Sequence, residues 1–319
     1  MLTEEEKLKI YAEFNKSRHW DYTDELIFDF LMSVYKESKP EDIIKLKKDF
    51  FFVEKNILKC MLSLEKLDIK PQYMSLYARR MNSKIFKTEN PTIVFDELLQ
   101  FTIKSFYLLV FSLANDRSDE NFEKCFKNCV MLLELQGNRH ELATYSYEKL
   151  VEMCKYPKNI LDLSMDAYWV SWTFIVAHEL YHVSNNTAES SYQEELDSDK
   201  YAYTVIINMI QAQKQGKTPK DLDVFHEYLY LAPLMMLEFF KLLDFYNALF
   251  GKKAEYIDYP SPELRQEKLF DMFDEYIPDS FDTVEGNGVF NCFLDEIDFI
   301  KEQLKLKKEN GKLDKIRET

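Results

Sequence analysis

The feature that most constrains this chain is its scarcity of glycine, with six glycines in 319 residues. Folds rich in β-strands use glycine heavily in tight turns and bulges, because glycine adopts positive φ angles without strain. We therefore expect a mainly α-helical protein with at most a small β-sheet. Charged residues make up 30% of the sequence and hydrophobic residues 46%, a balance typical of a soluble globular chain.

The first half of the chain is predicted to form a succession of amphipathic helices. Apolar residues recur at three- and four-residue spacing in DELIFDFLMSVYKES, DIIKLKKDFFFVEKNILKCMLSLEKL and FDELLQFTIKSFYLLVFSLAND. The best candidate boundary is KYPKN, at residues 155–159. We therefore predict a helical N-terminal region at 1–157 and a catalytic region at 158–319.

In the second region we expect one long, largely buried helix over residues 165–184, with Ser164 as its N-cap. A short edge strand is expected just before it, near KNILDLS. Two further helices are expected over about 190–213 and 224–250. Another helix is expected to begin at SPELRQEKLFDMF, and a final helix is expected after a loop at about 278–288.

The charge, apolar stretches and cysteines of the chain bear on its partners and location. A formal net charge of -15 lacks the basic surface that nucleic-acid backbones require, so no nucleic-acid partner is expected. The most apolar stretch, YLYLAPLMML, is about half the length of a membrane helix, so no membrane association is expected either. An odd number of cysteines without CxxC spacing predicts buried, reduced thiols in a cytoplasmic protein. They are Cys60, Cys125, Cys129, Cys154 and Cys292.

The segment HELYH at 178–182 holds two of the five histidines, four positions apart. Histidines at i and i+4 lie on one helix face, so His178 and His182 can offer imidazole nitrogens to one metal ion. Glu179 would lie beside that ion, where it can take a proton from water that the metal acidifies. The other histidines have no such neighbour and are expected to be surface or core residues: His19, His140 and His226.

A catalytic zinc site needs a third protein ligand, and SSYQEELDSDKYAYTVII follows the motif. If the chain turns back after His182, it forms two antiparallel helices. Residues that face each other across such a pair have residue numbers that add up to the same total. His182 and Glu195 form one such pair. His178 and Asp199 form another with the same sum. We therefore expect Glu195 to complete the ligand set, and Asp199 to accept a hydrogen bond from a ligand histidine.

Glu194 is the competing candidate for the third ligand, but it points about 100° away from Glu195 around the helix. Its position three residues after Ser191 matches a capping box at the start of a helix. We therefore expect Glu194 to cap the second helix. A solvated acidic helix start is the other interpretation of Glu195 and Asp199.

HELYH followed by EELDSDKYA resembles the HExxH plus ExxxD signature of gluzincin metallopeptidases. In that family the two histidines and the later glutamate bind zinc, the glutamate of HExxH is the base, and the aspartate orients a histidine. The corresponding residues are His178, His182, Glu195, Glu179 and Asp199, in that order. In size and motif placement the chain is also similar to phage-exclusion proteases of the Lit type.

The downstream segment DYPSPELRQEKL is similar to the HPSxxxRxxxL segment of prenyl-protein endopeptidases and their bacterial heat-shock relatives. Pro260, Ser261 and Arg265 stand at the offsets of that family, whereas Tyr259 stands where the family has histidine. The resemblance implies that Tyr259 and Arg265 are catalytic, with the phenol donating a hydrogen bond to the oxyanion. The alternative is an ordinary helix start, with Ser261 as N-cap and Pro262 at the first helical position.

Together these patterns predict a cytoplasmic zinc metalloprotease, an endopeptidase with zinc as its cofactor. An active endoprotease free in the cytosol would be toxic, so we expect cleavage of one or a few cytosolic proteins, controlled by a regulatory protein or trigger. The resemblance adds a role in stress or phage defence. The rival prediction is a non-catalytic helical binding or regulatory protein with a structural or vestigial zinc site. A fourth protein ligand would favour this rival, whereas an open position beside Glu179 would favour the enzyme.

Overall fold

The computed structural model describes residues 52–66, 72–76, 83–86, 91–134, 157–185, 191–219, 222–254, 256, 259–281 and 283–318. Across these residues the protein is mainly α-helical, as the scarcity of glycine predicts. The helix predicted over DELIFDFLMSVYKES lies outside the described residues, as do His19, His140 and Cys154.

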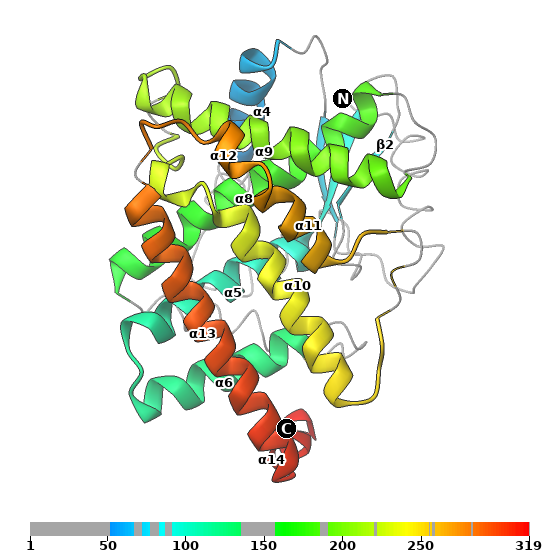
Figure 1. Ribbon diagram of the computed structural model, residues 1–319, viewed down its shortest axis with the longest axis vertical. Coiled ribbons are helices and arrows are strands. Elements are labelled where there is room, and N and C mark those ends of the chain that lie inside the picture. Colours follow the sequence, from blue (N-terminus) through cyan, green and yellow to red (C-terminus); the bar gives the residue numbers. More distant parts are fainter. Residues whose placement is uncertain are drawn as a thin grey trace, which may run out of the picture.

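Helices make up most of the described structure, and a small sheet lies at one edge of them (Figure 1). The first half contributes α4 (Phe52–Leu64), α5 (Glu97–Asn115) and α6 (Asp119–Glu134). The second half contributes α8 (Lys158–Ser184), α9 (Tyr192–Lys214), the 3-10 turn η2 (Glu227–Leu229), α10 (Ala232–Leu249), α11 (Pro262–Phe270), α12 (Phe273–Tyr276), α13 (Thr283–Glu309) and α14 (Lys312–Glu318).

The sheet has three strands in the order β1-β3-β2, formed by β1 (Gln72–Leu76), β2 (Ser83–Phe86) and β3 (Thr92–Asp96). β1 is parallel to β3, and β2 is antiparallel to it. The small sheet was predicted, but its expected location near KNILDLS was wrong. Those residues form the first turns of α8, where Ile160 is buried and the Ser164 hydroxyl donates to the Ile160 carbonyl. Ser164 is therefore inside the helix, and Pro157 stands at the N-cap position.

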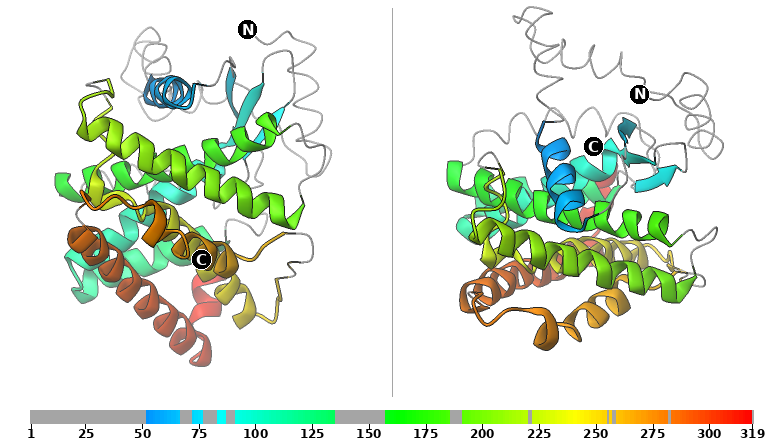
Figure 2. Two further views of the ribbon diagram at one scale, coloured as in Figure 1. Left: turned by 45° about the horizontal axis from the view of Figure 1, so that its top comes forward. Right: turned by 90° about the horizontal axis from the view of Figure 1, so that it is seen from above.

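Helix α8 runs through the core and packs against α9, α5, α10 and β2 (Figures 1 and 2). Trp172 and Phe174 are fully buried, and a helix that is apolar on most sides is expected to be enclosed by other elements. The Tyr107 hydroxyl of α5 contacts Ser171 of α8 and donates to the carbonyl of Ala232 in α10. Helices on both sides of residue 157 thus share one hydrophobic core, while the predicted division into two regions stays a prediction.

Two further boundaries differ from the prediction. The third helix begins at Ala232 rather than at 224, because Pro233 lies in its first turn and the residues before it form turns and η2. Helix α13, which was predicted to follow the loop at about 278–288, begins at Thr283, inside that loop. Gly286 is part of this helix, and a Cβ atom there would lie 2.3 Å from the Tyr230 ring. Gly286 is therefore required by the close packing of the Tyr230 ring against the helix, and not by a turn.

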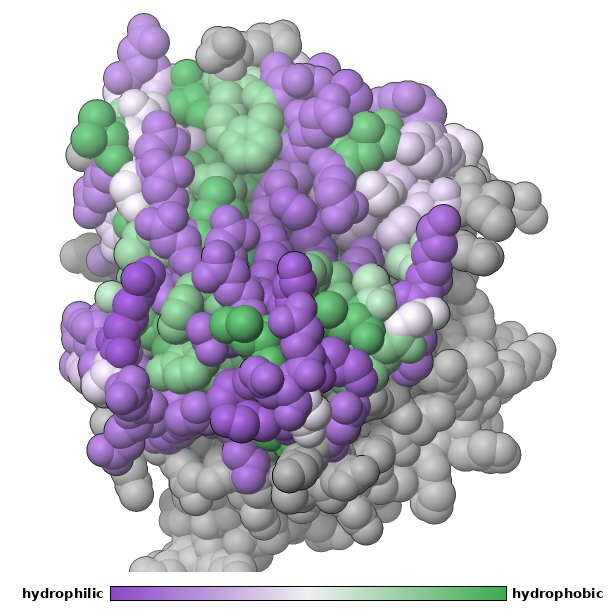
Figure 3. All heavy atoms as spheres, turned by 60° about the horizontal axis from the view of Figure 1, so that its bottom comes forward, coloured by the Kyte–Doolittle hydropathy of each residue, from purple (hydrophilic) through white to green (hydrophobic). Residues whose placement is uncertain are grey.

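The apolar stretch at 228–237 forms η2 and the buried start of α10. No helix among the described residues is both long and apolar enough to cross a membrane. Figure 3 shows a face on which hydrophilic side chains predominate and hydrophobic ones gather in smaller groups between them.

Candidate metal centre

The start of α9 fixes which acidic residues face α8. The Ser191 hydroxyl accepts a hydrogen bond from the Glu194 amide at 3.3 Å, and the Glu194 carboxylate accepts one from the Ser191 amide at 3.2 Å. This reciprocal pair is the predicted capping box. Glu195 and Asp199 are consequently turned inward, with exposed fractions of 4% and 1%. The interpretation of these two residues as a solvated helix start is therefore wrong.

Three side chains converge between α8 and α9. The Nε2 atoms of His178 and His182 lie 3.3 Å apart. Carboxylate oxygens of Glu195 lie 3.2 Å from Nε2 of His178 and 3.6 Å from Nε2 of His182. Ligands of a tetrahedral zinc ion stand about 2.0–2.2 Å from the metal, which places them roughly 3.3–3.6 Å from one another. The two Nε2 atoms and the Glu195 carboxylate therefore have the spacing of three ligands of one tetrahedral zinc ion, with a different carboxylate oxygen nearest to each histidine.

Among the described residues, no other histidine, cysteine or carboxylate side chain joins this group. Two imidazoles and one carboxylate form the ligand set of several catalytic zinc sites, in which the fourth position is left for water or substrate. The side chains present thus fit a catalytic zinc ion by both chemistry and spacing.

Asp199 fixes the orientation of the His178 ring. Its Oδ1 atom lies 2.8 Å from Nδ1 of His178, so that nitrogen carries the proton and Nε2 is directed at the ligand group. Burial alone would lower the pKa of His178, but the hydrogen bonds to Asp199 and Glu195 raise it to about 9. Because a metal binds the unprotonated imidazole nitrogen, a cation would compete with a proton at Nε2.

Arg265, at the start of α11, holds Asp199 from the other side. Its Nε and Nη2 atoms both donate to the Asp199 carboxylate at 2.6 Å. Burial would raise the pKa of Asp199, but Arg265 and His178 lower it to about 2. The Nη1 atom of Arg265 donates to the Tyr259 hydroxyl at 3.2 Å. The structure thus brings both residues of the downstream motif to the metal centre, and their catalytic role stays a prediction.

The helix-start interpretation of this downstream motif is also confirmed. The Ser261 hydroxyl accepts a hydrogen bond from the Leu264 amide at 3.3 Å, and Pro262 is the first residue of α11. The two interpretations are compatible, because the N-cap fixes the first turn of the helix that carries Arg265.

Ser198 belongs to the site but was not predicted. Its hydroxyl donates to the Glu194 carbonyl at 2.7 Å and lies 3.2 Å from Nε2 of His182. The sequence held a signal for it, because residues three apart share a helix face and Ser198 follows Glu195 by three.

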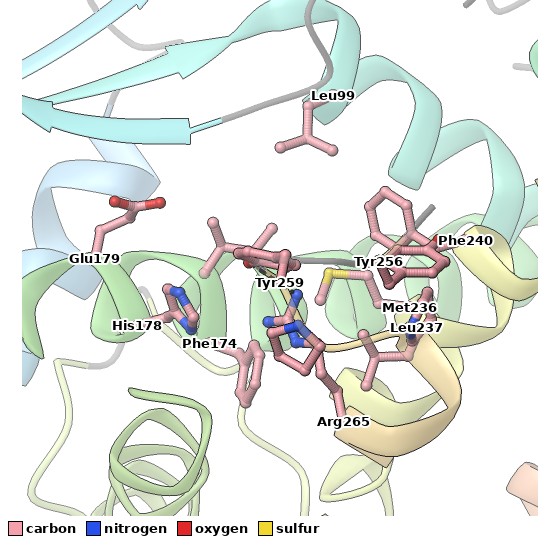
Figure 4. A pocket seen from close by; sticks show the side chains of 13 residues that line it. Leu99, Phe174, His178, Glu179, Met236, Leu237, Phe240, Tyr256, Tyr259 and Arg265 are labelled. Carbon is pink, nitrogen blue, oxygen red and sulfur yellow. Dashed lines mark hydrogen bonds between the residues drawn. The ribbon is translucent and has the colours of Figure 1, made fainter. Parts of the chain in front are cut away.

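Glu179 borders a pocket of about 320 Å³ that His178, Tyr259 and Arg265 also line. Neighbouring residues of a helix diverge by about 100°, so Glu179 cannot share the ligand face of His178. Figure 4 shows its carboxylate on the side of the sheet, while the His178 ring points the other way. The predicted base and the ligand group therefore border one pocket from different faces of α8.

The remaining predicted residues lie elsewhere. His226 contacts Asp166 of α8 and stacks on Tyr228, away from the ligand group. Cys60, Cys125 and Cys129 are buried free thiols, as predicted, whereas Cys292 is exposed. It lies on the outward face of α13, so the prediction that it is buried was wrong.

Comparison with known proteins finds no matching family model, no matching curated protein and no matching solved structure. A functional argument therefore has to start from the site itself.

Proposed function

We propose that the protein is a zinc-dependent endopeptidase of the gluzincin type, with zinc held by His178, His182 and Glu195. The observation that carries the proposal is the convergence of two Nε2 atoms, 3.3 Å apart, with the Glu195 carboxylate, whose Oε2 lies 3.2 Å from His178 and whose Oε1 lies 3.6 Å from His182. These separations suit one tetrahedral ion. The pocket beside Glu179 supports an enzyme over a structural zinc site, because it offers room for a substrate next to the ligands.

Bound zinc would act as a Lewis acid on water and on the peptide carbonyl. Glu179 is the general base, which takes a proton from the attacking water and delivers it to the leaving amine. Tyr259, which lines the pocket, donates a hydrogen bond to the oxyanion that forms on the carbonyl. Arg265 holds both Tyr259 and Asp199, and Asp199 keeps the His178 ring oriented.

We infer that the substrates are one or a few cytosolic proteins and that a regulatory protein or trigger controls cleavage, in stress or phage defence. The size of the pocket supports restricted access, because about 320 Å³ admits a side chain rather than a folded segment. The formal charge of -15 favours a basic substrate or partner segment.

Metal analysis tests the ligand set. Protein purified without chelators should contain close to one zinc per chain, and His178→Ala or Glu195→Ala should remove most of it. Glu194→Ala is the matched control, because it changes the adjacent glutamate that caps α9 and should retain zinc. Full zinc content in the His178→Ala and Glu195→Ala proteins would rule out the ligand assignment.

Catalysis is tested with Glu179→Gln, which removes the base and leaves all three ligands. Zinc content should match wild type, whereas new protein termini should arise only in cells that express the wild type. We expect a few specific termini and no cleavage of casein. Hundreds of unrelated cleavages would contradict restricted specificity. An identical set of termini for both proteins, under stress and phage challenge alike, would favour the non-catalytic zinc protein.

A further inference from the structure

Helix α11 carries Arg265 into the metal centre, but it is too short to hold its own position. It has nine residues, and isolated helices shorter than about 12 residues are marginal in water. Its place therefore depends on contacts with the helices that it packs against, α9 and α10 (Figure 1). Arg265 supplies a polar contact with α9, because it donates two hydrogen bonds to Asp199.

A different face of α11 carries a buried glutamine. Gln266 is 7% exposed, and neighbouring positions of a helix diverge by about 100°, so it meets α10 while Arg265 meets α9. The Nε2 atom of Gln266 donates to the Glu238 carboxylate at 2.8 Å and to the Leu234 carbonyl at 3.2 Å, both on α10. Two consecutive residues thus tie α11 to two different helices.

Glu238 is a buried anchor for this glutamine. It is 2% exposed, and a buried carboxylate is tolerated only where partners replace water. Lys241, one turn along α10, donates to Oε1 of Glu238 at 2.6 Å and to Oε1 of Gln266 at 2.9 Å. Lys301 of α13 adds a second cation, 4.0 Å from the other carboxylate oxygen. The ring formed by Glu238, Gln266 and Lys241 engages both ends of the Gln266 amide and so fixes its orientation.

The effect of this polar ring on geometry matters more than its effect on stability. A buried ion pair often adds no net stability compared with apolar residues of the same volume. Its hydrogen bonds, however, are met in only one placement of α11. A shift of this helix by one residue would turn it by about 100° and move it by about 1.5 Å, which would separate Arg265 from Asp199.

We propose that Gln266 is a positioning residue of the metal centre. Together with its partners on α10, it holds α11 in the placement at which Arg265 pairs with both oxygens of Asp199. Asp199 in turn orients the His178 ring towards the ligand group. The inference rests on the proposed function, because the ion that this chain of contacts serves is the zinc held by that group.

The zinc affinity of Gln266→Met tests the inference. Methionine keeps the approximate length and volume of the side chain and removes its hydrogen bonds. We expect a loss of about 3- to 10-fold, which is part of the 10- to 100-fold loss that follows when a ligand loses its hydrogen-bond partner. Gln266→Asn is a second variant, because its amide is one methylene too short to reach the same acceptors, and it should also lose affinity. Chelator competition with the full-length chain would measure the dissociation constants.

A double variant separates positioning from general stability. If Gln266 acts through the paired geometry of Arg265, its effect should vanish where that geometry is already lost, because residues of one network are not additive. Gln266→Met combined with Arg265→Lys should therefore bind zinc no more weakly than Arg265→Lys alone. Losses that add up in the double variant would overturn the proposed route through Arg265.

Two controls distinguish this effect from an ordinary loss of packing. Glu267→Met changes the next position of α11, which is exposed. Leu304→Ala removes a fully buried side chain of α13 and should lower the free energy of unfolding through the cavity that it leaves. Both variants should keep the zinc affinity of the wild type. A loss of zinc affinity in Leu304→Ala as large as that in Gln266→Met would overturn the positioning role.

The two proposals fail in different ways in this experiment. Wild-type zinc affinity in both Gln266 variants would overturn the positioning role and leave the zinc site standing. Failure of the wild-type chain to bind zinc would contradict the proposed function itself, and the positioning role with it.

Discussion

At the scale of single residues, Asp199 links a candidate metal ligand, His178, to Arg265, although it does not belong to the ligand group itself. Its carboxylate is 1% exposed and accepts hydrogen bonds from His178 and, twice, from Arg265. A buried charge is tolerated only where such partners replace water. Asp199 therefore joins α8 and α11 through α9.

Asp199→Asn should weaken both zinc binding and folding. The amide cannot neutralise Arg265 and orients His178 less strongly, so we expect a 10- to 100-fold loss of zinc affinity. Leaving the Arg265 charge unpaired should lower the free energy of unfolding by about 3–5 kcal/mol. Chelator-competition titration and urea unfolding would measure the two effects.

The neighbouring Asp197→Asn is the matched control for this prediction, because Asp197 contacts Gln193 on the surface and should tolerate the change. Arg265→Lys should give an intermediate loss, since lysine keeps the charge but not the paired geometry. Wild-type zinc affinity in Asp199→Asn would refute the orienting role of Asp199.

The convergence of His178, His182 and Glu195 could be predicted from sequence because they lie close together along the chain. The sum rule for antiparallel helices needs only residue numbers, and it correctly paired His178 with Asp199. The contact between Arg265 and Asp199 spans 66 residues, and no periodicity links them. The segment DYPSPELRQEKL suggested a role for Arg265 in the site but did not indicate that Arg265 pairs with Asp199.

At the scale of elements, His226 lies in the segment that links α9 to α10 and holds that segment against α8. Its Nε2 atom lies 3.5 Å from the Asp166 carboxylate, and its ring stacks on Tyr228 with centroids 5.3 Å apart. The hydrogen bond to Asp166 raises the pKa of His226, although partial burial opposes the charge. The folded protein therefore favours the protonated form.

This contact should make stability depend on pH with a definite sign. Because the folded state raises the pKa of His226, its stabilisation is complete below the ordinary value of about 6.5 and is lost as pH rises through the raised value. The urea midpoints of wild type and His226→Gln should differ most below the ordinary pKa of about 6.5 and converge as pH rises through the raised pKa of His226. In an Asp166→Asn background the convergence should vanish. A difference that stays constant with pH would contradict the role of the ion pair.

Helices were predicted more reliably than the strands and the element boundaries. Short apolar runs such as KNILDLS fit a strand or a buried helix equally well, and here packing of Ile160 against the core extends α8. The β-branched run Thr92, Ile93 and Val94 was the available signal for β3. No element was predicted for these three residues, and the predicted helix after them began at Phe95, which belongs to β3.

At the scale of the whole molecule, zinc would join two central helices, so its removal should lower global stability. A ligand that binds only the folded state adds about 2.7 kcal/mol when present at 100 times its dissociation constant. We expect a chelator to lower the Tm of zinc-loaded wild type by several degrees and excess zinc to restore it. His178→Ala should show neither response. Equal shifts in both proteins would place the zinc effect outside this site.

The fold class could be predicted from composition because a strand-rich fold of this length would need glycine in many tight turns, and the chain has only six glycines. The arrangement of the helices did not, since contacts such as Tyr107 with Ala232 join residues 125 positions apart. Helical periodicity shows which face is buried but leaves open the element that covers it. The pocket depends on that pairing, and it was not predicted.

The metal ligands lie between residues 178 and 195, whereas the pocket draws on α5, α8, α10 and α11. During synthesis from the N-terminus, the residues of the α8–α9 hairpin are joined to the chain before Met236, Phe240 and Arg265. Its contacts are local and can form early. Under the proposed function, zinc could be bound as soon as this hairpin forms, whereas a complete pocket would require the C-terminal helices to dock.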